Sequence, residues 1–423
     1  MKAKIGENKL QKKDEKTHMN IAILFEHPHA DEKGIQLTAQ ELGINLDFIP
    51  FRKVSVCIGN GEYSIKSKRK DYTEIFDNVD VVLNRAQSRN RRLLAANVIE
   101  AFDKGVINPS SVEFTCFSKL RTLLRLWNEG VKIPLTVYVP CNPQEQRVGG
   151  GEIHNEEEIA HLIQQKLGHT DIVVKPDAGS HGKDIRLAKN HEDLLQILEK
   201  VEPSITHPVG VLAQELVPKW FYDLRIIVYK ESGKKPYCVT KAMARAGFKD
   251  FRTNTYLGNM VFGINLSSHL QQKAVECAEA IGKDGEAWML ALDAMVDVGE
   301  NKIVEDEYVK SELQDLTSHF KAVEKVERER RDISSFSDWN LKLENAFQDY
   351  LNSDPYLNIK SVIEKSIAEG QDSVLFHEVN SCPDFWERTR LVTGVNLAVP
   401  LLKCAKSIAE SGKHANPLEL QVK

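Results

Sequence analysis

The chain has 423 residues, of which 42% are hydrophobic and 28% charged, and its formal net charge of −5 at pH 7 gives no overall attraction to nucleic acid. This length predicts two to four compact modules, and no apolar run approaches the roughly 20 residues that span a bilayer. The seven cysteines are scattered, odd in number and never arranged as C-x-x-C, so they indicate neither a disulfide framework nor a zinc site, as expected in a reducing cytoplasm.

The first 115 residues predict a leader followed by a small layered domain. Residues 1–18 are Lys-rich and polar, so they cannot bury a core, and we expect a disordered leader. After Met19, apolar runs that predict strands alternate with helix-like stretches. The strands are expected at 20–25, 45–50 and 79–83, and the helices at 34–42 and 93–102. This alternation predicts a mostly parallel sheet over residues 19–115.

A second unit is expected over residues 116–213. A helix near 117–129 ends at Gly130 and is followed by the strand-like run IPLTVYV. A further helix over 156–167 leads to IVVKP, which predicts the next strand. The stretch DAGSHGKD, residues 177–184, joins this strand to IRLA, and it predicts a β-hairpin with a mobile tip that bears glycine.

Residues 214–410 predict a third unit of strands and helices. A strand at 209–215 crosses into this unit, further strands are expected at 224–229, 237–244, 290–298 and 374–379, and helices are expected at 268–281 and 397–410. Between the last two strands lies a charged segment, about residues 305–371, that contains EKVERERRD and predicts an exposed helical insertion. Residues 411–423 are polar and predict a flexible tail.

Two lysines stand at the edges of predicted elements. Lys119 begins a helix and Lys175 ends an apolar strand. A lysine that ends a buried strand is a rigid point charge, which suits the binding of a polyphosphate. The alternative is a pair of solvated surface lysines.

The loop after Lys175 contains two glycines and a hydroxyl group. Its residues are Gly179, Ser180, His181, Gly182 and Lys183. Because glycine lets the backbone approach a ligand closely, the N–H groups of this loop can contact an anion. The loop lacks the Walker spacing, and an ordinary hairpin turn is the alternative.

Three oxygen-bearing side chains stand at the ends of two apolar runs. They are Asp297, Glu378 and Asn380, and the last two would share one face of a strand. Carboxylates on apolar strands are costly to bury unless a cation compensates them, and Mg²⁺ prefers such oxygens. We therefore predict a magnesium site, with a structural salt bridge to Arg245 or Arg252 as the alternative.

Planar donors follow the strand predicted at 237–244. Arg245, Arg252 and Asn254 can bind carboxylate or phosphoryl oxygens. Arginines in such positions stabilise charge that develops during phosphoryl transfer, so we predict a catalytic role. Isolated surface arginines are the alternative.

Six stretches together resemble the RimK-like branch of the ATP-grasp superfamily, which includes the RimK glutamate ligases and the LysX/ArgX-type ligases. In chain order they read FSKLRTLLRLWNEGVKIPLT, IVVKPDAGSHGKDI, LAQELVPKWFYDLRIIVY, MARAGFKDFRTN, LDAMVDV and FHEVNSCPDF. The resemblance runs from about residue 79 to residue 402. The charged segment interrupts it. This insertion is unusual, since related enzymes usually join the two strands on either side of it by a short turn.

The resemblance implies a mixed α/β (α+β) chain with the ATP-grasp fold. Its parts would be an N-terminal pre-ATP-grasp domain over 19–115, a small central lid over 116–213 and a C-terminal ATP-grasp subdomain over 214–410. The implied activity is that of a carboxylate–amine ligase, which consumes ATP and acts through an acyl phosphate.

The resemblance also implies roles for individual residues. Lys119 and Lys175 would bind the ATP phosphates, and the loop from Gly179 to Lys183 would close over them. Gln214, Glu215 and Val217, with Leu216 between them, would form the hinge that receives the adenine, and Asp223 would be a further nucleotide contact. Two Mg²⁺ ions, for which Mn²⁺ can substitute, would be held by Asp297, Glu378 and Asn380. Substrate carboxylates would be bound by Arg85, Arg89 and Arg225, and the transferring phosphoryl group by Arg245, Arg252 and Asn254.

Three interpretations of the substrate and role stay open. The enzyme could join an amino acid to a peptide or carrier protein, in which case the charged insertion could supply a docking surface. It could instead make a free dipeptide or amide, as glutathione synthetase does. A nucleotide-binding regulator without catalysis is the third. Because related enzymes are often dimers or tetramers, we also expect a homo-oligomer.

Overall fold

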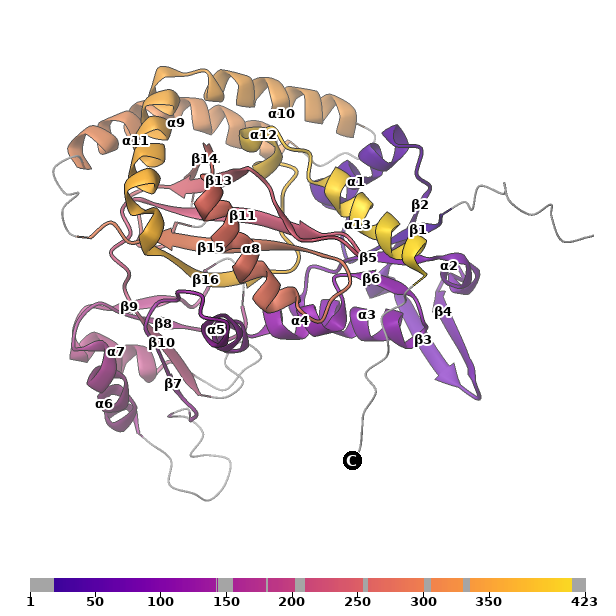
Figure 1. Ribbon diagram of the computed structural model, residues 1–423, viewed down its shortest axis with the longest axis horizontal. Helices are drawn as coiled ribbons and strands as arrows, with labels where there is room; N and C mark the ends of the chain where they lie inside the picture. Colours follow the sequence, from indigo (N-terminus) through magenta and orange to yellow (C-terminus); the bar gives the residue numbers. More distant parts are fainter. Residues whose placement is uncertain are drawn as a thin grey trace, which may run out of the picture.

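The computed structural model describes residues 19–141, 143, 155–179, 182–201, 210–253, 258–299, 306–329 and 335–412. Across this part of the chain, three larger sheets and one two-stranded hairpin are surrounded by helices (Figure 1). The predicted leader and nearly all of the predicted tail lie outside the described residues. None of the helices that the structure describes combines the length and the apolarity needed to cross a bilayer.

The N-terminal sheet is parallel and has the order β2-β1-β5-β6. Its strands are β1 (Ile21–Phe25), β2 (Leu46–Pro50), β5 (Val81–Arg85) and β6 (Gly105–Ile107). The helices of this region are α1 (Ala30–Glu41), α2 (Thr73–Asn78), α3 (Arg89–Ala101) and α4 (Ser110–Phe117). Parallel strands need crossover connections, and the helices between these strands supply them.

A hairpin that the sequence analysis did not predict extends from this region. It consists of β3 (Val54–Gly59) and β4 (Glu62–Ser67), joined by Asn60 and Gly61. Both turn residues have positive φ, at 52° and 78°, which is the conformation that an Asn-Gly turn favours. The Asn-Gly pair was therefore the signal that could have revealed this hairpin.

The central sheet is antiparallel and has the order β7-β10-β8-β9. Its strands are β7 (Thr136–Val139), β8 (Ile172–Lys175), β9 (Arg186–Ala188) and β10 (Val211–Glu215). Helices α6 (Glu156–Leu167) and α7 (His191–Leu198) accompany this sheet, whereas α5 (Lys119–Asn128) contacts α4, α8 and β16. A separate cluster of buried side chains, including Ile159, Ile163 and Leu194, joins α6 and α7 to this sheet. The sheet thus has a core of its own.

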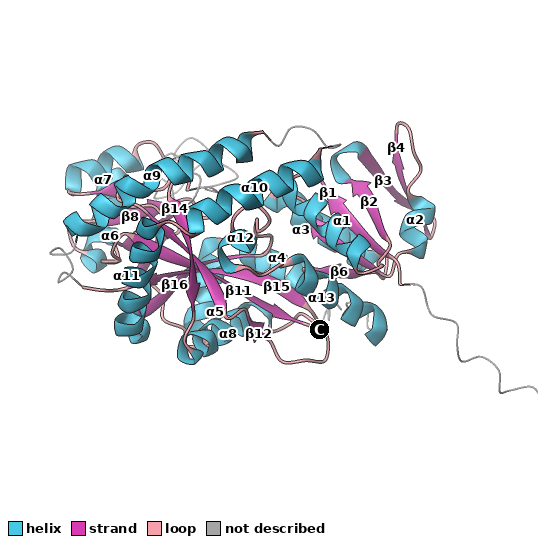
Figure 2. Cartoon of the chain, turned by 90° about the horizontal axis from the view of Figure 1, so that it is seen from above, coloured by secondary structure: helices cyan, strands magenta, loops and turns pink. Residues whose placement is uncertain are grey.

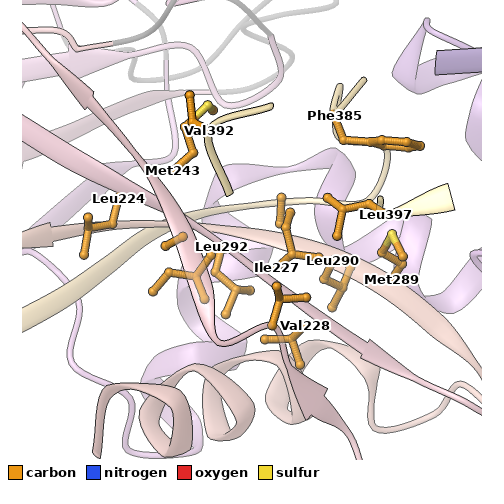
Figure 3. Packing of buried hydrophobic residues seen from close by; sticks show 14 of the residues in the cluster. Leu224, Ile227, Val228, Met243, Met289, Leu290, Leu292, Phe385, Val392 and Leu397 are labelled. Atoms are coloured by element: carbon orange, nitrogen blue, oxygen red, sulfur yellow. The ribbon is translucent and has the colours of Figure 1, made fainter. Parts of the chain in front are cut away.

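The largest sheet is also antiparallel and has the order β14-β13-β11-β15-β16, with β12 beside β11. Its strands are β11 (Tyr222–Lys230), β12 (Tyr237–Cys238), β13 (Lys241–Ala246), β14 (Met260–Asn265), β15 (Trp288–Val296) and β16 (Val374–Asn380). Helix α8 (Ser268–Gly282) packs against β11 and β15, and α13 (Ala398–Ser411) packs between this sheet and the parallel one. Figure 3 shows buried side chains of β11 and β15 packed together, with Val392, Leu397 and Phe385 beside them.

The charged segment between β15 and β16 forms three helices, of which α9 and α10 lie along one edge of the molecule in Figure 2 while α11 runs away from that edge. They are α9 (Asp306–Arg328), α10 (Phe336–Leu351) and α11 (Asp354–Gly370), and the short helix α12 (Thr389–Thr393) lies beside them. Each long helix buries an apolar stripe in the main core, such as Leu316 of α9 and Ile363 of α11, both with no exposed surface. The prediction of an exposed insertion is thus correct for one face of these helices and wrong for the other.

Candidate active site

A cavity of about 790 Å³ is lined by residues of all three larger sheets. This volume is in the range of small-molecule sites. The predicted site residues that line it are Arg85, Arg89, Lys175, Gly182, Glu215, Leu216, Val217, Asp223, Arg225, Arg245, Arg252, Glu378 and Asn380. Segments more than 200 residues apart in the chain therefore meet around one space.

One predicted metal ligand lies elsewhere. Asp297 follows the end of β15, where its N–H donates to the carbonyl of Ser373 and its backbone pairs with Lys219. The residue that lies directly opposite Glu378 is Asp293, in the middle of β15. The prediction that Asp297 joins Glu378 is wrong, because strand register decides which of two aspartates in the same apolar run faces the cavity.

Asp293 is 3% exposed, and arginines surround its carboxylate. Arg225 donates two hydrogen bonds of 2.8 Å to it, and Arg245 Nη2 lies 3.3 Å from its Oδ2. Arg245 also binds both oxygens of Asp223, at 2.7 and 2.8 Å. Burial alone would raise the pKa of Asp293, but Arg225 and Arg245 outweigh it and hold the pKa well below its usual range. The carboxylate is therefore ionised at neutral pH.

Glu378 and Asn380 complete the oxygen cluster. Arg89 Nη2 donates to Glu378 Oε1 at 2.8 Å and to Asn380 Oδ1 at 3.3 Å. Burial opposes the ionisation of Glu378, but Lys119 and Arg89 outweigh it and lower its pKa to about 2. Asn380 Nδ2 lies 3.4 Å from Asp293 Oδ2, which links the two strands. Two ionised carboxylates and an amide oxygen form a donor set that suits Mg²⁺.

Three lysines lie in this region, of which Lys119 is buried and Lys175 and Lys219 are half-buried. Burial lowers the pKa of Lys175 to about 8, although the nearby Glu378 partly opposes the shift. Burial also lowers the pKa of Lys219 to about 8 and lowers that of Lys119. Lys219 was not predicted from the sequence, because no local pattern separates it from a surface lysine. Together these cations provide the charge that a polyphosphate requires.

The start of α5 is tied to the loop that follows β8. Ser118 Oγ and the N–H of Leu120 both donate to Asp177 Oδ1 at 2.8 Å, and Lys119 Nζ lies 3.4 Å from the carbonyl of Gly179. The carboxylate of Asp177 thereby satisfies an N–H at the helix N-terminus. This contact explains how Lys119 reaches the site although it does not line the cavity.

The structure describes the glycine loop at Gly179 and again from Gly182 onward. Gly182 lines the cavity, and its carbonyl accepts a hydrogen bond of 2.9 Å from Arg252 Nη1. Lys183 follows it in the described chain, whereas the predicted contacts Ser180 and His181 lie outside the described residues. Arg252 also forms a bidentate pair with Asp250, and the predicted catalytic Asn254 lies outside the described residues.

The predicted adenine hinge contributes three of its four residues to the cavity. Glu215, Leu216 and Val217 line it, where β10 ends. Gln214 is 1% exposed, and its Nε2 donates to Thr136 Oγ1 at 2.8 Å. Gln214 therefore supports the strand from behind, whereas the three residues after it face the cavity.

The predicted substrate arginines differ in how they are held. Arg85 is buried and contacts Glu32 Oε1 at 3.4 Å and Asp31 Oδ2 at 3.7 Å. Its Nη1 donates to the carbonyl of Pro383 at 3.1 Å. Arg85 is thus enclosed by acids, whereas Arg89 directly contacts the predicted metal ligands.

One further side chain was missed from the sequence. Asp293 pairs with Glu378, but the next pair is Ala294 with Phe376, so His377 has no partner on β15. Such a bulge re-aims side chains, and His377 lines the cavity together with Glu378. Its buried Nε2 has no hydrogen-bond partner among the described residues, and burial lowers its pKa to about 4.

The chain is similar to several known proteins. A family model of the RimK-like ATP-grasp domain matches residues 144–312. A protein of Sulfurisphaera tokodaii named alpha-aminoadipate–LysW ligase LysX is 25% identical over 289 residues, which cover 68% of this chain and 89% of that protein. The coenzyme gamma-F420-2:alpha-L-glutamate ligase of Methanocaldococcus jannaschii is 24% identical over 203 residues, or 47% of this chain and 60% of that protein.

Solved structures show the same fold at low sequence identity. D-alanyl-alanine synthetase A from Vibrio cholerae superposes with a TM-score of 0.52 at 10% identity, covering 93% of this chain and 99% of that one. A RimK domain ATP-grasp protein from Sphaerobacter thermophilus gives 0.50 at 12% identity, covering 92% and 99%. The predicted α/β fold is confirmed. Residues 144–312 match a RimK-like ATP-grasp domain and the chain is similar to LysX ligases over 68% of its length, which supports its assignment as an ATP-dependent carboxylate–amine ligase.

Proposed function

We propose that the enzyme activates a substrate carboxylate with ATP and joins it to the amine of an amino acid. The observation that carries this proposal is the convergence of two ionised carboxylates, buried Asp293 and half-buried Glu378, with Lys175 and Lys219 on one cavity. A metal–polyphosphate matches such a site, because its metal ions suit the carboxylates and its anionic oxygens suit the lysines.

Asp293, Glu378 and Asn380 are the residues that would hold two Mg²⁺ ions, because each presents a hard oxygen to the cavity. Bound Mg²⁺ supplies charge neutralisation at the phosphate oxygens. The lysines would bind the phosphates, and the hinge at Glu215 to Val217 would receive the adenine.

The reaction proceeds in two steps that need no protein nucleophile. A substrate carboxylate oxygen attacks the γ-phosphorus of ATP, ADP leaves, and an acyl phosphate forms. The amine nitrogen then attacks the acyl carbon, phosphate leaves, and the nitrogen loses its proton. Arg245 and Arg252 would stabilise the charge that develops on the phosphoryl oxygens, while Arg89 would hold the substrate carboxylate. The protein therefore contributes by positioning the substrates and by stabilising the developing charge.

The part of the cavity lined by residues after Asn380 supports an amino-acid substrate. Beyond Asn380 its lining carries both signs of charge, from Asp384 and Glu387 to Arg328 and Arg388. An amino acid carries an ammonium and a carboxylate, which such a lining can pair. The relative named alpha-aminoadipate–LysW ligase supports attachment to a peptide or carrier protein over a free small amide. All seven cysteines are free, in keeping with a reducing cytoplasm.

A screen for ADP release tests this proposal. Purified enzyme, Mg²⁺ and ATP are combined with amino acids and acidic peptides, and the product of each active pair is identified by mass. We expect amino-acid-dependent ADP release and a product mass equal to acid plus amine minus water. Nucleotide binding without ADP release for any pair would instead favour a regulator that has lost catalysis.

A further inference from the structure

The helical insertion reaches the active-site cavity at the end of α9. Glu324, Glu327 and Arg328 of its last turns line the cavity, more than 25 residues after the catalytic strand β15. In Figure 1, α9 and α10 lie beside α12, which follows β16 closely in the chain. The insertion therefore belongs to the site as well as to the core.

Its helices hold the segment that follows the predicted metal ligands. Arg388 donates two hydrogen bonds to the carboxylate of Glu327, at 2.8 and 2.7 Å. The side chains of this pair are only 20% and 13% exposed. On α10, Asn340 Oδ1 accepts from Trp386 Nε1 and from Arg390 Nη2, both at 2.9 Å. Three side chains of residues 386–390 are thus held by the insertion.

The same segment is held from the other side by α1. The backbone N–H groups of Phe385 and Trp386 both donate to Asp31 Oδ1 at 2.8 Å. Gly34 of α1 leaves room for the Trp386 ring, because a Cβ at that position would lie 2.0 Å from it. The segment over residues 382–389, which we call the acceptor wall, is therefore clamped between α1 and the insertion while it lines the cavity.

We propose that the insertion builds the amino-acid end of the active site, and that Glu327 is a positioning residue that holds Arg388 and the acceptor wall for an amino-acid substrate. This inference rests on the proposed function and adds the binding subsite. A bidentate pair between planar guanidinium and carboxylate groups fixes orientation as well as distance. Arg388 itself lines the cavity, so loss of Glu327 frees a cation where a zwitterionic ligand would bind.

The test compares Glu327→Gln with Glu329→Gln. Both changes remove a negative charge near the end of α9. The side chain of Glu329 is 46% exposed, its ion pair with Lys342 is long at 4.0 Å, and it does not line the cavity. For each variant we measure the KM for ATP, the KM for the active amino acid, the Kd for Mg·ADP and the melting temperature. We expect Glu327→Gln to raise the amino-acid KM by about tenfold or more, as for loss of a charged hydrogen-bonded pair. Its Kd for Mg·ADP and the values of Glu329→Gln should stay within about twofold of the wild type.

Two results would overturn the inference. One is an unchanged amino-acid KM in Glu327→Gln, and the other is an equal rise in both KM values together with a lower melting temperature, which a purely structural role would produce.

Calorimetry separates this inference from the proposed ligase activity. A panel of standard amino acids is titrated into the Mg·ADP-loaded enzyme. If an amino acid binds without supporting ADP release, the ligase proposal fails, and the Kd of that amino acid in Glu327→Gln then decides the inference. If no amino acid binds to the wild type, the acceptor wall does not have the assigned role.

Discussion

The chemistry of the cavity depends on buried charges that are each compensated by a neighbour of opposite charge. Asp293 has Arg225 and Arg245, and Glu378 has Arg89. Removing one member of such a pair leaves the other charge buried and uncompensated, which costs about 3–5 kcal/mol. Single substitutions here therefore change stability as well as activity, so isosteric variants are the informative ones.

Asp293→Asn tests the assignment of the metal ligand. It keeps the side-chain volume but removes a negative charge, so we expect ADP release to fall by about three orders of magnitude. The matched control is Asp297→Asn on the same strand run, which should stay within about threefold of the wild type because Asp297 does not line the cavity. Similar losses in the two variants, measured at saturating ATP, would contradict the assignment.

Lys175 predicts a pH dependence of nucleotide affinity. Its pKa is lowered from 10.5 to about 8 by burial, so the free enzyme loses this charge as the pH rises through about 8. A bound polyphosphate favours the ammonium form and raises that pKa, so affinity is highest below pH 8. Above it, the Kd for ADP should rise by up to about tenfold per pH unit. In Lys175→Arg the rise should be weaker, and an equally steep rise would assign the effect elsewhere, with Lys219 as the next candidate.

The same shift affects the free protein with the opposite sign. Because the folded pKa lies below 10.5, the charged form of Lys175 destabilises the fold, fully so below pH 8. Stability of the ligand-free protein should therefore gain from this group as the pH rises from 8 towards 10.5.

His377 is expected to contact the nucleotide beside Lys175. The bulge in β16 turns its ring into the cavity, and its buried Nε2 has no partner among the described residues. A buried polar atom without a partner is costly, and a ligand hydrogen bond would remove that cost. Calorimetry should show the Kd for ADP rising about fivefold to fiftyfold in His377→Ala. An unchanged Kd in a variant with the wild-type melting temperature would show that the ring does not contact ADP.

At the scale of elements, the insertion is held by its apolar stripe as well as by polar contacts. Leu316 and Val323 of α9 have no exposed surface, and Tyr350 of α10 donates to the carbonyl of Val261 at 2.9 Å. Deleting residues 306–370 would therefore expose the face of the large sheet that these helices cover. Deletion is for this reason a poor test of function, and single substitutions on the cavity side are preferable.

Leu316→Ala measures how strongly the insertion is coupled to the fold. A fully buried leucine cut to alanine leaves a cavity, so we expect a loss of about 2–5 kcal/mol in the free energy of unfolding. Leu341→Ala on α10 is the control, because that leucine is 58% exposed and its loss should cost less than about 0.5 kcal/mol. Chemical denaturation measures both values. A negligible cost for Leu316→Ala would mean that the insertion packs only loosely on the core.

At the scale of the whole molecule, three sheets with partly separate cores share one cavity. Lys175 of the central sheet and Glu378 of the large sheet both line it and attract each other. A ligand that bridges both should therefore stabilise their relative arrangement. Binding to the folded state at a ligand concentration of 100 times Kd stabilises by about 2.7 kcal/mol.

A thermal shift experiment tests this coupling. We expect Mg·ADP to raise the melting temperature of the wild type and of Glu329→Gln by similar amounts. At the same nucleotide concentration, Lys175→Ala should show little rise, since it lacks a cation on the central-sheet side. A full rise in Lys175→Ala would place the nucleotide away from that lysine.

Much of this molecule was predictable because its signals are local. Alternating apolar runs and helical stretches predicted the parallel N-terminal sheet, and the strand ending in Lys175 placed a cation beside a glycine loop. The Asn60-Gly61 turn was equally local but was overlooked. Six motifs in family order indicated the ATP-grasp fold. Each motif is a short stretch whose residues can be recognised without knowing how distant parts of the chain pack.

The active-site details depended on contacts between distant segments. Asp293 and Asp297 are indistinguishable in LALDAMVDV, and only the pairing of β15 with β16, across an insertion of three helices, places Asp293 opposite Glu378. The many charged residues of the insertion led to the prediction of an exposed segment. Its apolar residues are recognised as core residues only when the helices are packed against the large sheet. Strand register, bulges and ion pairs are set by the packing of the folded chain. They bring together groups that are far apart in sequence, so that apolar side chains are buried and buried polar groups have partners.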